Sequence, residues 1–337
     1  MMKLPEVNID YEELYKMLFP AIRKKLLLTG IELKVFNYLS DPTSAEDVAQ
    51  SIASNPRNTR LFLDGLAAID LVQKKSGLYQ NAPIAQAFLV EGNQTYLGQL
   101  LNFMAKADGP LKNLTTLVKD GPPPKPETPP FSEEMLAQSA FIMANTERAG
   151  DAQRVVKIVS KLPEFSSFQK MLDLGGGPGI IGMAIVSAHP KMKGVIFDLP
   201  PVIRVAETFI KEYQMEDRME TLCGDFNRDH IGEGYDLVFT SNALHFAQVI
   251  DSVVKKIYDS LNPSGVFVSI LGFGLTHERT KPESLVLGLL PVALMGQEHG
   301  FYHGCVADSM LRVGFKSIRS QNLDTAWGPM ELDIGRK

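Results

Sequence analysis

Three aspartates and one histidine, each placed at the end of an apolar run or just after one, are the side chains that could carry chemistry here. Asp173 stands before a stretch in which four glycines fall within five positions, 175–179. Asp198 and Asp225 close later apolar runs, and His245 follows another. Glycine tolerates a positive φ and has no side chain to hold a ligand away from the backbone. The glycine stretch therefore predicts a ligand-binding turn between a strand and a helix.

Two cofactor classes bind at turns of this shape, and glycine spacing alone does not separate them. Gly177, Gly179 and Gly182 satisfy G-x-G-x-x-G, the pattern of dinucleotide sites. Together with Asp173 and Gly175, the first two also satisfy the acidic-x-G-x-G-x-G pattern of S-adenosylmethionine sites. A carboxylate at the strand end can meet a cationic amino-acid tail but would face a pyrophosphate badly. The longer pattern favours S-adenosylmethionine.

The composition bounds the class of protein. The chain has 337 residues, 45% apolar and 22% charged, which is enough for two domains or one large one with a proper core. A net charge of −5 argues against a nucleic-acid backbone as the main partner. The two cysteines, Cys223 and Cys305, fit a reducing compartment. With no signal-peptide pattern and no 18-residue apolar run, we expect a cytoplasmic protein that does not bind or span a membrane.

The N-terminal third reads as helical. Residues 11–39 predict two helices, broken at Pro20, with a broad apolar face that needs a cover from this chain or from a second copy. The segment 41–80 then predicts a helix opened by a capping box at Thr43, a second helix and a hairpin, which is the winged-helix order. Residues 41–90 hold four basic and five acidic side chains, which favours a structural or dimerising role over DNA binding.

The middle of the chain is predicted to supply a connector and a pocket lining. Helical patterns at 84–119 and 132–161 flank a proline-rich linker at 121–130. Phenylalanine and methionine at helical spacing are usually core residues, but here they could line a pocket for a flat aromatic acceptor. The candidates for that lining are Phe103, Phe141 and Met143.

From the glycine stretch onward, strands and helices alternate. This alternation predicts a parallel sheet with helices on both faces, in which ligands bind beyond the carboxyl ends of the strands. The last two strands are expected to be antiparallel. The expected strands are 171–174, 194–198, 219–223, 235–240, 266–271, 315–323 and 329–336, with helices at 179–188, 248–261 and 283–295.

The side chains after these strands suit the parts of a sulfonium nucleoside. Asp198, 21 positions after Gly177, is placed to hold a ribose diol, with Leu199 beside it. Asp225 and Phe226 suit an adenine amino group and ring face. Ser241 and Asn242 follow the fourth strand, and His245 comes next. A neutral imidazole there could take a proton from a substrate hydroxyl as it attacks.

These features resemble the class I S-adenosylmethionine-dependent O-methyltransferases of the hydroxyindole and caffeate type. The matching segments are 173–179, 197–200, 224–226 and 235–245, and the resemblance covers nearly the whole chain. It implies a Rossmann-like, seven-stranded, mostly parallel sheet after a helical winged-helix dimerisation domain. It further implies methyl transfer from S-adenosylmethionine with His245 as general base, and an intertwined homodimer. We therefore expect domains at 1–110, 111–161 and 162–337, the second a connector.

Two positions depart from that family's pattern. Phe246 and Ala247 stand where Asp-Trp is usual, and Ser241 replaces a common lysine. The acid that orients the histidine usually comes from the C-terminal region, where Glu298 is the first candidate and Asp308 the second. These changes leave the acceptor open, and carbon methylation or drifted chemistry on the same cofactor are alternatives.

The segment 298–305 also invites a metal reading. His299 and His303 are four residues apart and would share a helix face, but Gly300 and Gly304 disfavour a helix. We expect these histidines to line the substrate pocket and no metal to be bound. Two remoter alternatives for the whole protein are a nicotinamide-dependent oxidoreductase and a winged-helix regulator that senses a small molecule.

Overall fold

The computed structural model describes residues 7–106, 109–124, 132–272, 274–275, 278, 280–296 and 302–337. The chain divides into two compact units between Phe103 and Met104. Within the described ranges, none of the helices is both long enough and apolar enough to cross a membrane. Since residues 104–337 group together, the separate connector at 111–161 stays a prediction.

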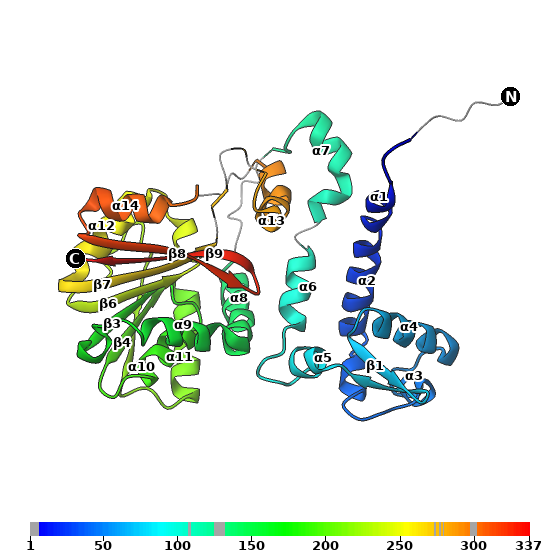
Figure 1. The fold of residues 1–337 in the computed structure, drawn as a ribbon. Helices are drawn as coiled ribbons and strands as arrows, with labels where there is room; N and C mark the ends of the chain where they lie inside the picture. Colours follow the sequence, from blue (N-terminus) through cyan, green and yellow to red (C-terminus); the bar gives the residue numbers. More distant parts are fainter. Residues whose placement is uncertain are drawn as a thin grey trace. The chain divides into compact units, whose positions relative to one another are not determined.

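The first unit is built from short helices and one hairpin (Figure 1). Its core gathers Phe36, Leu63, Leu66 and Tyr79, all less than 2% exposed. The predicted helix–helix–hairpin order is present. The elements are α1 (Glu12–Lys16), α2 (Phe19–Glu32), η1 (Val35–Tyr38), α3 (Ala45–Ser51), α4 (Pro56–Ala68), β1 (Val72–Lys75), β2 (Leu78–Asn81), α5 (Pro83–Phe88) and α6 (Gly98–Lys106), the last of which runs past the boundary.

Two helix starts differ from the prediction by a few residues. Pro20 lies in the first turn of α2, where a missing N–H costs no hydrogen bond, so the interruption between α1 and α2 falls just before this proline. The cap of α3 is Ser44, whose Oγ accepts the N–H of Asp47, one position after the predicted Thr43 pair. Either hydroxyl could accept the bond, and the backbone of Thr43 is already paired with Tyr79 in an isolated bridge.

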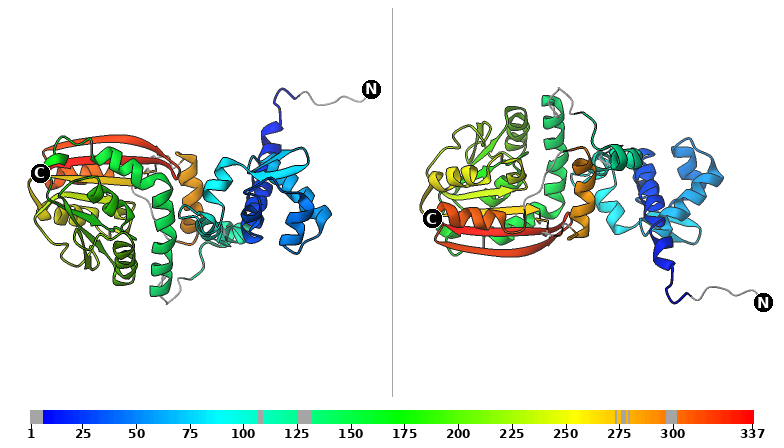
Figure 2. Two further views of the ribbon diagram at one scale, coloured as in Figure 1. Left: turned by 90° about the horizontal axis from the view of Figure 1, so that it is seen from below. Right: turned by 90° about the horizontal axis from the view of Figure 1, so that it is seen from above.

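The second unit is a seven-stranded sheet in the order β5-β4-β3-β6-β7-β9-β8. The first five strands in this order pair in parallel and only β9 runs against the others, which confirms the expected fold class. Figure 2 shows the long β8–β9 hairpin along one edge. The strands are β3 (Lys170–Leu174), β4 (Lys193–Asp198), β5 (Met219–Cys223), β6 (Tyr235–Ser241), β7 (Leu261–Gly272), β8 (Ser317–Thr325) and β9 (Gly328–Arg336).

Helices cover both faces of this sheet (Figure 1). On one face α9 (Ala152–Val159), α10 (Ile180–Ser187) and α11 (Pro200–Glu212) share an apolar core with α8 (Glu133–Thr146). On the other face lie α12 (Ile250–Ser260) and α14 (Cys305–Val313). The predicted helix 132–161 is interrupted by a π-helical turn, η3 (Glu147–Asp151), where Gly150 has φ 137°. The remaining helices are η2 (Gly109–Asn113), α7 (Leu114–Asp120), η4 (Phe165–Ser167), η5 (Leu244–Phe246) and α13 (Glu283–Leu294).

The strand order fixes where a ligand can bind. From β3 the chain moves outward to β4 and β5, then returns to place β6 on the other side of β3. Because the connections diverge at β3 and β6, a crevice is expected beyond the carboxyl ends of these two strands. Both the glycine turn and the segment that carries His245 follow these ends.

Candidate functional site

The glycine turn joins β3 to α10, and close packing leaves no space for a side chain at most of its glycines. Gly175, Gly177 and Gly179 have φ of 67°, 56° and 79°, a region that other residues rarely adopt. A Cβ on Gly175 would lie 2.3 Å from the Cβ of Ala243, and one on Gly179 would lie 2.3 Å from Cδ1 of Ile196. Gly177 differs, because its nearest neighbour on that side would be Oε1 of Glu147 at 3.9 Å. The turn therefore has one open side, at Gly177.

Asp173 lies beneath this turn rather than at its surface. Its side chain is 1% exposed, and its Oδ2 would be 2.5 Å from a Cβ on Gly182 and 2.9 Å from one on Gly176. Burial raises the pKa of Asp173 to about 7, against the opposing effect of the Gly182 N–H. A group so enclosed supports the start of α10, and direct contact between Asp173 and a ligand stays a prediction.

The raised pKa of Asp173 gives a test in the absence of ligand. The folded protein keeps the Asp173 proton up to about pH 7, whereas the unfolded chain loses it at about pH 4. Between these values this group lowers the free energy of unfolding by up to about 1.4 kcal/mol per pH unit as pH rises. The free energy of unfolding of Asp173→Asn should lack that decline. The difference between this variant and the wild type should therefore shift in favour of the variant from pH 5 to pH 7. Chemical denaturation at each pH measures it, and a pH-independent difference would contradict the expectation.

Asp198 holds the turn from the neighbouring strand. Its Oδ2 accepts the N–H of Gly177 at 2.8 Å, and its Oδ1 accepts the N–H of Leu199 at 2.7 Å. Burial raises the pKa of Asp198, while these two N–H groups oppose the rise. Leu199 is the N-cap residue of α11. Each carboxylate oxygen keeps a second lone pair, so the predicted bond to a ribose hydroxyl is compatible with both contacts.

Asp225 and Phe226 follow β5 in a turn that is braced from within. Oδ1 of Asp225 accepts two N–H groups of Asn227, from the backbone at 2.9 Å and from the side chain at 3.0 Å. The ring of Phe226 is half-buried, and its Cε1 would lie 3.9 Å from a Cβ on Gly175. Phe226 therefore borders the glycine turn, and the contacts of Phe226 and Asp225 with an adenine stay predictions.

Asn242 and His245 follow β6, on the other side of the turn. Asn242 has φ 51°, and its Oδ1 accepts the N–H of Gly272 at the end of β7. Ser241 is the last residue of β6 and is half-buried. His245 lies in η5, is exposed, and has its ring centroid 4.1 Å from that of Phe246. Asn227 also links the two segments, because its Nδ2 donates to the carbonyl of Phe246.

The predicted substrate residues are dispersed. Phe141 is 46% exposed on α8, and its ring meets Phe209 edge-on at 5.6 Å. Met143 is half-buried on the same helix, and Phe103 belongs to the first unit. Nδ1 of His303 lies 3.3 Å from Oε1 of Glu331, and this histidine precedes α14. Glu298 and His299 lie outside the described residues, and Asp308 accepts the hydroxyl of Tyr302.

One carboxylate near the turn was missed by sequence reasoning. Glu147, the first residue of η3, accepts the N–H of Ile181 on its Oε2 at 3.2 Å. Burial and the neighbouring Asp173 raise the pKa of Glu147 well above its usual range. No local motif marks it, since it sits in a run that reads as continuous helix.

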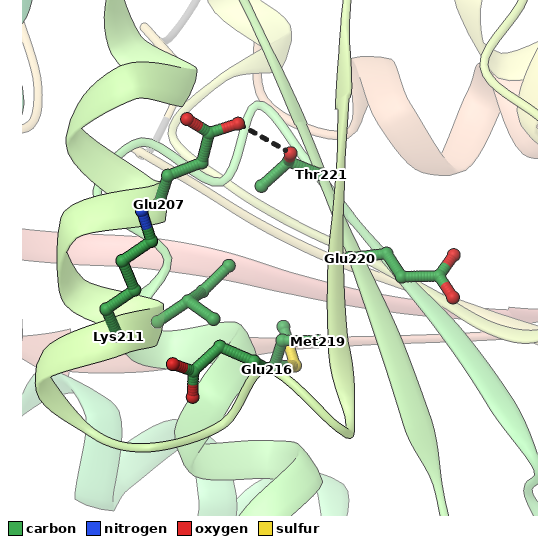
Figure 3. Close-up of a pocket in the computed structure, with 7 residues that line it drawn as sticks. Glu207, Lys211, Glu216, Met219, Glu220 and Thr221 are labelled. Atoms are coloured by element: carbon green, nitrogen blue, oxygen red, sulfur yellow. Dashed lines mark hydrogen bonds between the residues drawn. The ribbon is translucent and has the colours of Figure 1, made fainter.

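A hollow in the second unit lies between α11 and β5 (Figure 3). It is bordered by Glu207, Lys211 and Glu216, and Thr221 donates to Oε1 of Glu207 at 3.2 Å. Its strand residues come from the first part of β5, whereas the ligand turn follows the end of that strand. It contains none of the predicted site residues.

The residues around the glycine turn fit S-adenosylmethionine. At the open side of Gly177 the nearest described atom to a built Cβ is Oε1 of Glu147, and Asp198 accepts the N–H of Gly177. Both residues carry carboxyl groups, which suit hydroxyls and an ammonium group but not a pyrophosphate. Gly175 lies beside Phe226 and beside Ala243, which follows the end of β6.

Comparison with known proteins gives the family. The model of the O-methyltransferase domain matches residues 134–300, and that of the O-methyltransferase dimerisation domain matches 15–91. The N,N-dimethyltransferase OxyT of Streptomyces rimosus is 30% identical over 72% of this chain and 73% of its own. The 3-hydroxy-5-methyl-1-naphthoate 3-O-methyltransferase of Streptomyces sahachiroi is 27% identical over 79% and 78%. An uncharacterized Methanocaldococcus jannaschii protein is 28% identical over 72% of this chain, which spans 65% of that relative.

A solved structure agrees on the fold. Human N-acetylserotonin methyltransferase in complex with S-adenosylmethionine superposes with a TM-score of 0.78 at 22% identity, over 99% of both chains. The chain belongs to the O-methyltransferase family and is an S-adenosylmethionine-dependent methyltransferase. This decides between the two cofactor patterns and sets aside the nicotinamide alternative.

Proposed function

We propose that this protein methylates a hydroxyl oxygen of a small aromatic acceptor, with His245 as the general base. The observation that carries the proposal is the position of His245. It lies in η5, four residues after the end of β6, and β6 is the neighbour of β3, the strand that leads into the glycine turn. The name of the naphthoate 3-O-methyltransferase supports an aromatic hydroxyl as the acceptor.

The chemistry divides between the donor and the chain. S-adenosylmethionine, when bound, supplies a methyl group on a sulfonium, which is open to in-line attack. A phenol has a pKa of about 10, so at neutral pH it needs a base in order to ionise. His245 would accept that proton, which contributes on the order of 100-fold or more to the rate. Gly177, Asp198 and Phe226 would hold the donor, and fixed alignment of the two reactants supplies the larger share.

A second acceptor class has a specific observation in its favour. OxyT, whose name describes an N,N-dimethyltransferase, is 30% identical to this chain. An aromatic amine is a nucleophile without prior loss of a proton, so its methylation would depend less on His245. The acceptor atom is therefore open to a direct test.

The proposed function is tested by incubating the protein with S-adenosylmethionine and matched pairs of phenols and anilines. Mass spectrometry would identify each product, and calorimetry with S-adenosylhomocysteine and with NAD would check donor binding. We expect methylated phenols and binding of S-adenosylhomocysteine only. Transfer to anilines alone would overturn the assignment of oxygen as the acceptor.

We also propose that the first unit forms a homodimer. It carries the family's dimerisation domain, and a run of apolar side chains on its N-terminal segment is more than half exposed. An apolar face of this extent is rarely left to solvent in a monomer. The exposed residues are Val7, Ile9, Tyr11, Leu14, Tyr15, Met17, Leu18, Phe19 and Ile22.

Charges on this face should separate the protomers. The double variant Leu14→Asp with Leu18→Asp would bury two carboxylates in the contact, which disfavours the dimer by several kcal/mol, on the order of 100-fold or more in dissociation constant. Analytical ultracentrifugation should show dimers for the wild type and monomers for the variant. Leu61→Asp, also on an exposed leucine of this unit, should stay dimeric. A variant that sediments like the wild type would exclude this face.

A further inference from the structure

Glu147 brings a carboxylate to the glycine turn from outside the sheet. It lies where α8 gives way to the π-helical turn, and its two oxygens face different neighbours. Oε2 accepts the N–H of Ile181, in the first turn of α10. Oε1 is the nearest atom to a Cβ built on Gly177, at 3.9 Å, so it borders the open side of the turn.

No basic side chain among the described residues forms an ion pair with Glu147. The adjacent Arg148 turns to α11, where its Nε donates to the hydroxyl of Tyr213 at 2.7 Å and its Nη2 to Glu212 at 3.1 Å. Arg154 pairs with Asp151 instead.

A second buried acid lies close to Glu147. Among the described residues, none donates a hydrogen bond to Oδ2 of Asp173, and this residue is 1% exposed. Burial and the proximity of the two carboxyl groups raise the pKa of Glu147. Such an arrangement disfavours a second negative charge and favours a cation at the open side. Asp173 itself is enclosed by Gly176 and Gly182, which leaves no room beside it for an ammonium group.

We propose that Glu147 binds the α-ammonium group of the donor's amino-acid tail, the role that sequence reasoning gave to Asp173. The inference rests on S-adenosylmethionine as the donor. The carboxylate of Glu147 borders the open side of the turn, while Asp173 supports the turn from below. Glu147 is thus a residue that selects an amino-acid nucleoside over the same nucleoside without the amine.

The test compares two ligands that differ only in that amine. Calorimetry measures S-adenosylhomocysteine and its deaminated analogue, which keeps the thioether and the carboxylate. Glu147→Gln keeps an oxygen for the N–H of Ile181 and removes the charge. The wild type should prefer S-adenosylhomocysteine by roughly 10- to 100-fold, the range of a charge-assisted hydrogen bond. E147Q should lose most of that preference and bind the analogue as the wild type does.

Three further variants keep the result interpretable. Glu147→Asp keeps a charge and should retain part of the preference, whereas Glu147→Ala should lose it, so a folding failure in one variant leaves two others. Glu133→Gln, an exposed glutamate of α8 paired with Arg204, is the control and should match the wild type. Equal preference in wild type and E147Q would overturn this proposal alone. Binding of neither compound by the wild type would overturn the donor assignment and this proposal with it.

Discussion

Gly177→Ala should weaken binding of S-adenosylhomocysteine by roughly 10- to 200-fold, the effect of one added methyl group in a fitted site. The new Cβ would meet no protein atom closer than 3.9 Å, so it would enter the open space beside Glu147 rather than the core. Its φ of 56° adds about 1–2 kcal/mol of backbone strain, which the fold should survive. Calorimetry measures the loss of binding, and the midpoint of thermal unfolding measures the loss of stability from backbone strain.

Gly175→Ala should show the opposite pattern, with stability lost first. Its Cβ would lie 2.3 Å from that of Ala243, and its φ is 67°. Overpacking and backbone strain together cost roughly 2–5 kcal/mol. Gly314→Ala, with φ 111° and open space around it, is the control for strain alone and should bind the donor normally. If Gly177→Ala bound S-adenosylhomocysteine like the wild type, the donor site would lie elsewhere.

The sheet could be predicted because its signals are local. Strands β3, β4 and β6 are apolar runs that end at glycine, proline or polar residues, and they are buried on both faces, as central parallel strands should be. Strand 219–223 was predicted with the observed bounds. The spacing of 21 positions between Gly177 and Asp198 predicted that both belong to one ligand site, and in the structure the N–H of Gly177 donates to Asp198.

The orientation of Asp173 could not be predicted from the same pattern. A strand that is buried on both faces shows no alternation of polar and apolar residues, so the sequence does not say which face a side chain takes. In the structure Met171 and Asp173 face α10, while Leu172 and Leu174 face the opposite core. The acid therefore ends under the helix instead of in front of it.

Glu147 escaped prediction for a different reason. It lies more than twenty positions before the motif, and its approach to the turn depends on how α8, η3 and α9 pack on α10. The interruption at Gly150, with φ 137°, sets the direction of that segment, but a single glycine in a helical run is an ambiguous signal. Contacts of this kind are fixed by tertiary packing alone.

His245→Ala should lower turnover of a phenolic acceptor by about 100-fold or more while leaving the affinity for S-adenosylhomocysteine unchanged. The imidazole is exposed on η5 and lies tilted against the ring of Phe246, whereas the backbone N–H groups of residues 175–177 in the glycine turn donate to oxygens of Phe197 and Asp198. Losing the ring should therefore remove a proton acceptor without disturbing the donor site.

The pH profile distinguishes loss of a base from loss of shape. A phenol ionises at a pKa of about 10. The rate of His245→Ala should rise steadily with pH toward that value, because the acceptor then ionises without help, whereas the wild-type rate should depend less on pH over the same range, because a base removes the proton. His230→Ala, an exposed histidine whose Nδ1 accepts the N–H of Gly232, is the matched control and should keep the wild-type profile. Unchanged turnover in His245→Ala would exclude this histidine from proton transfer, and weaker donor binding would make its role structural.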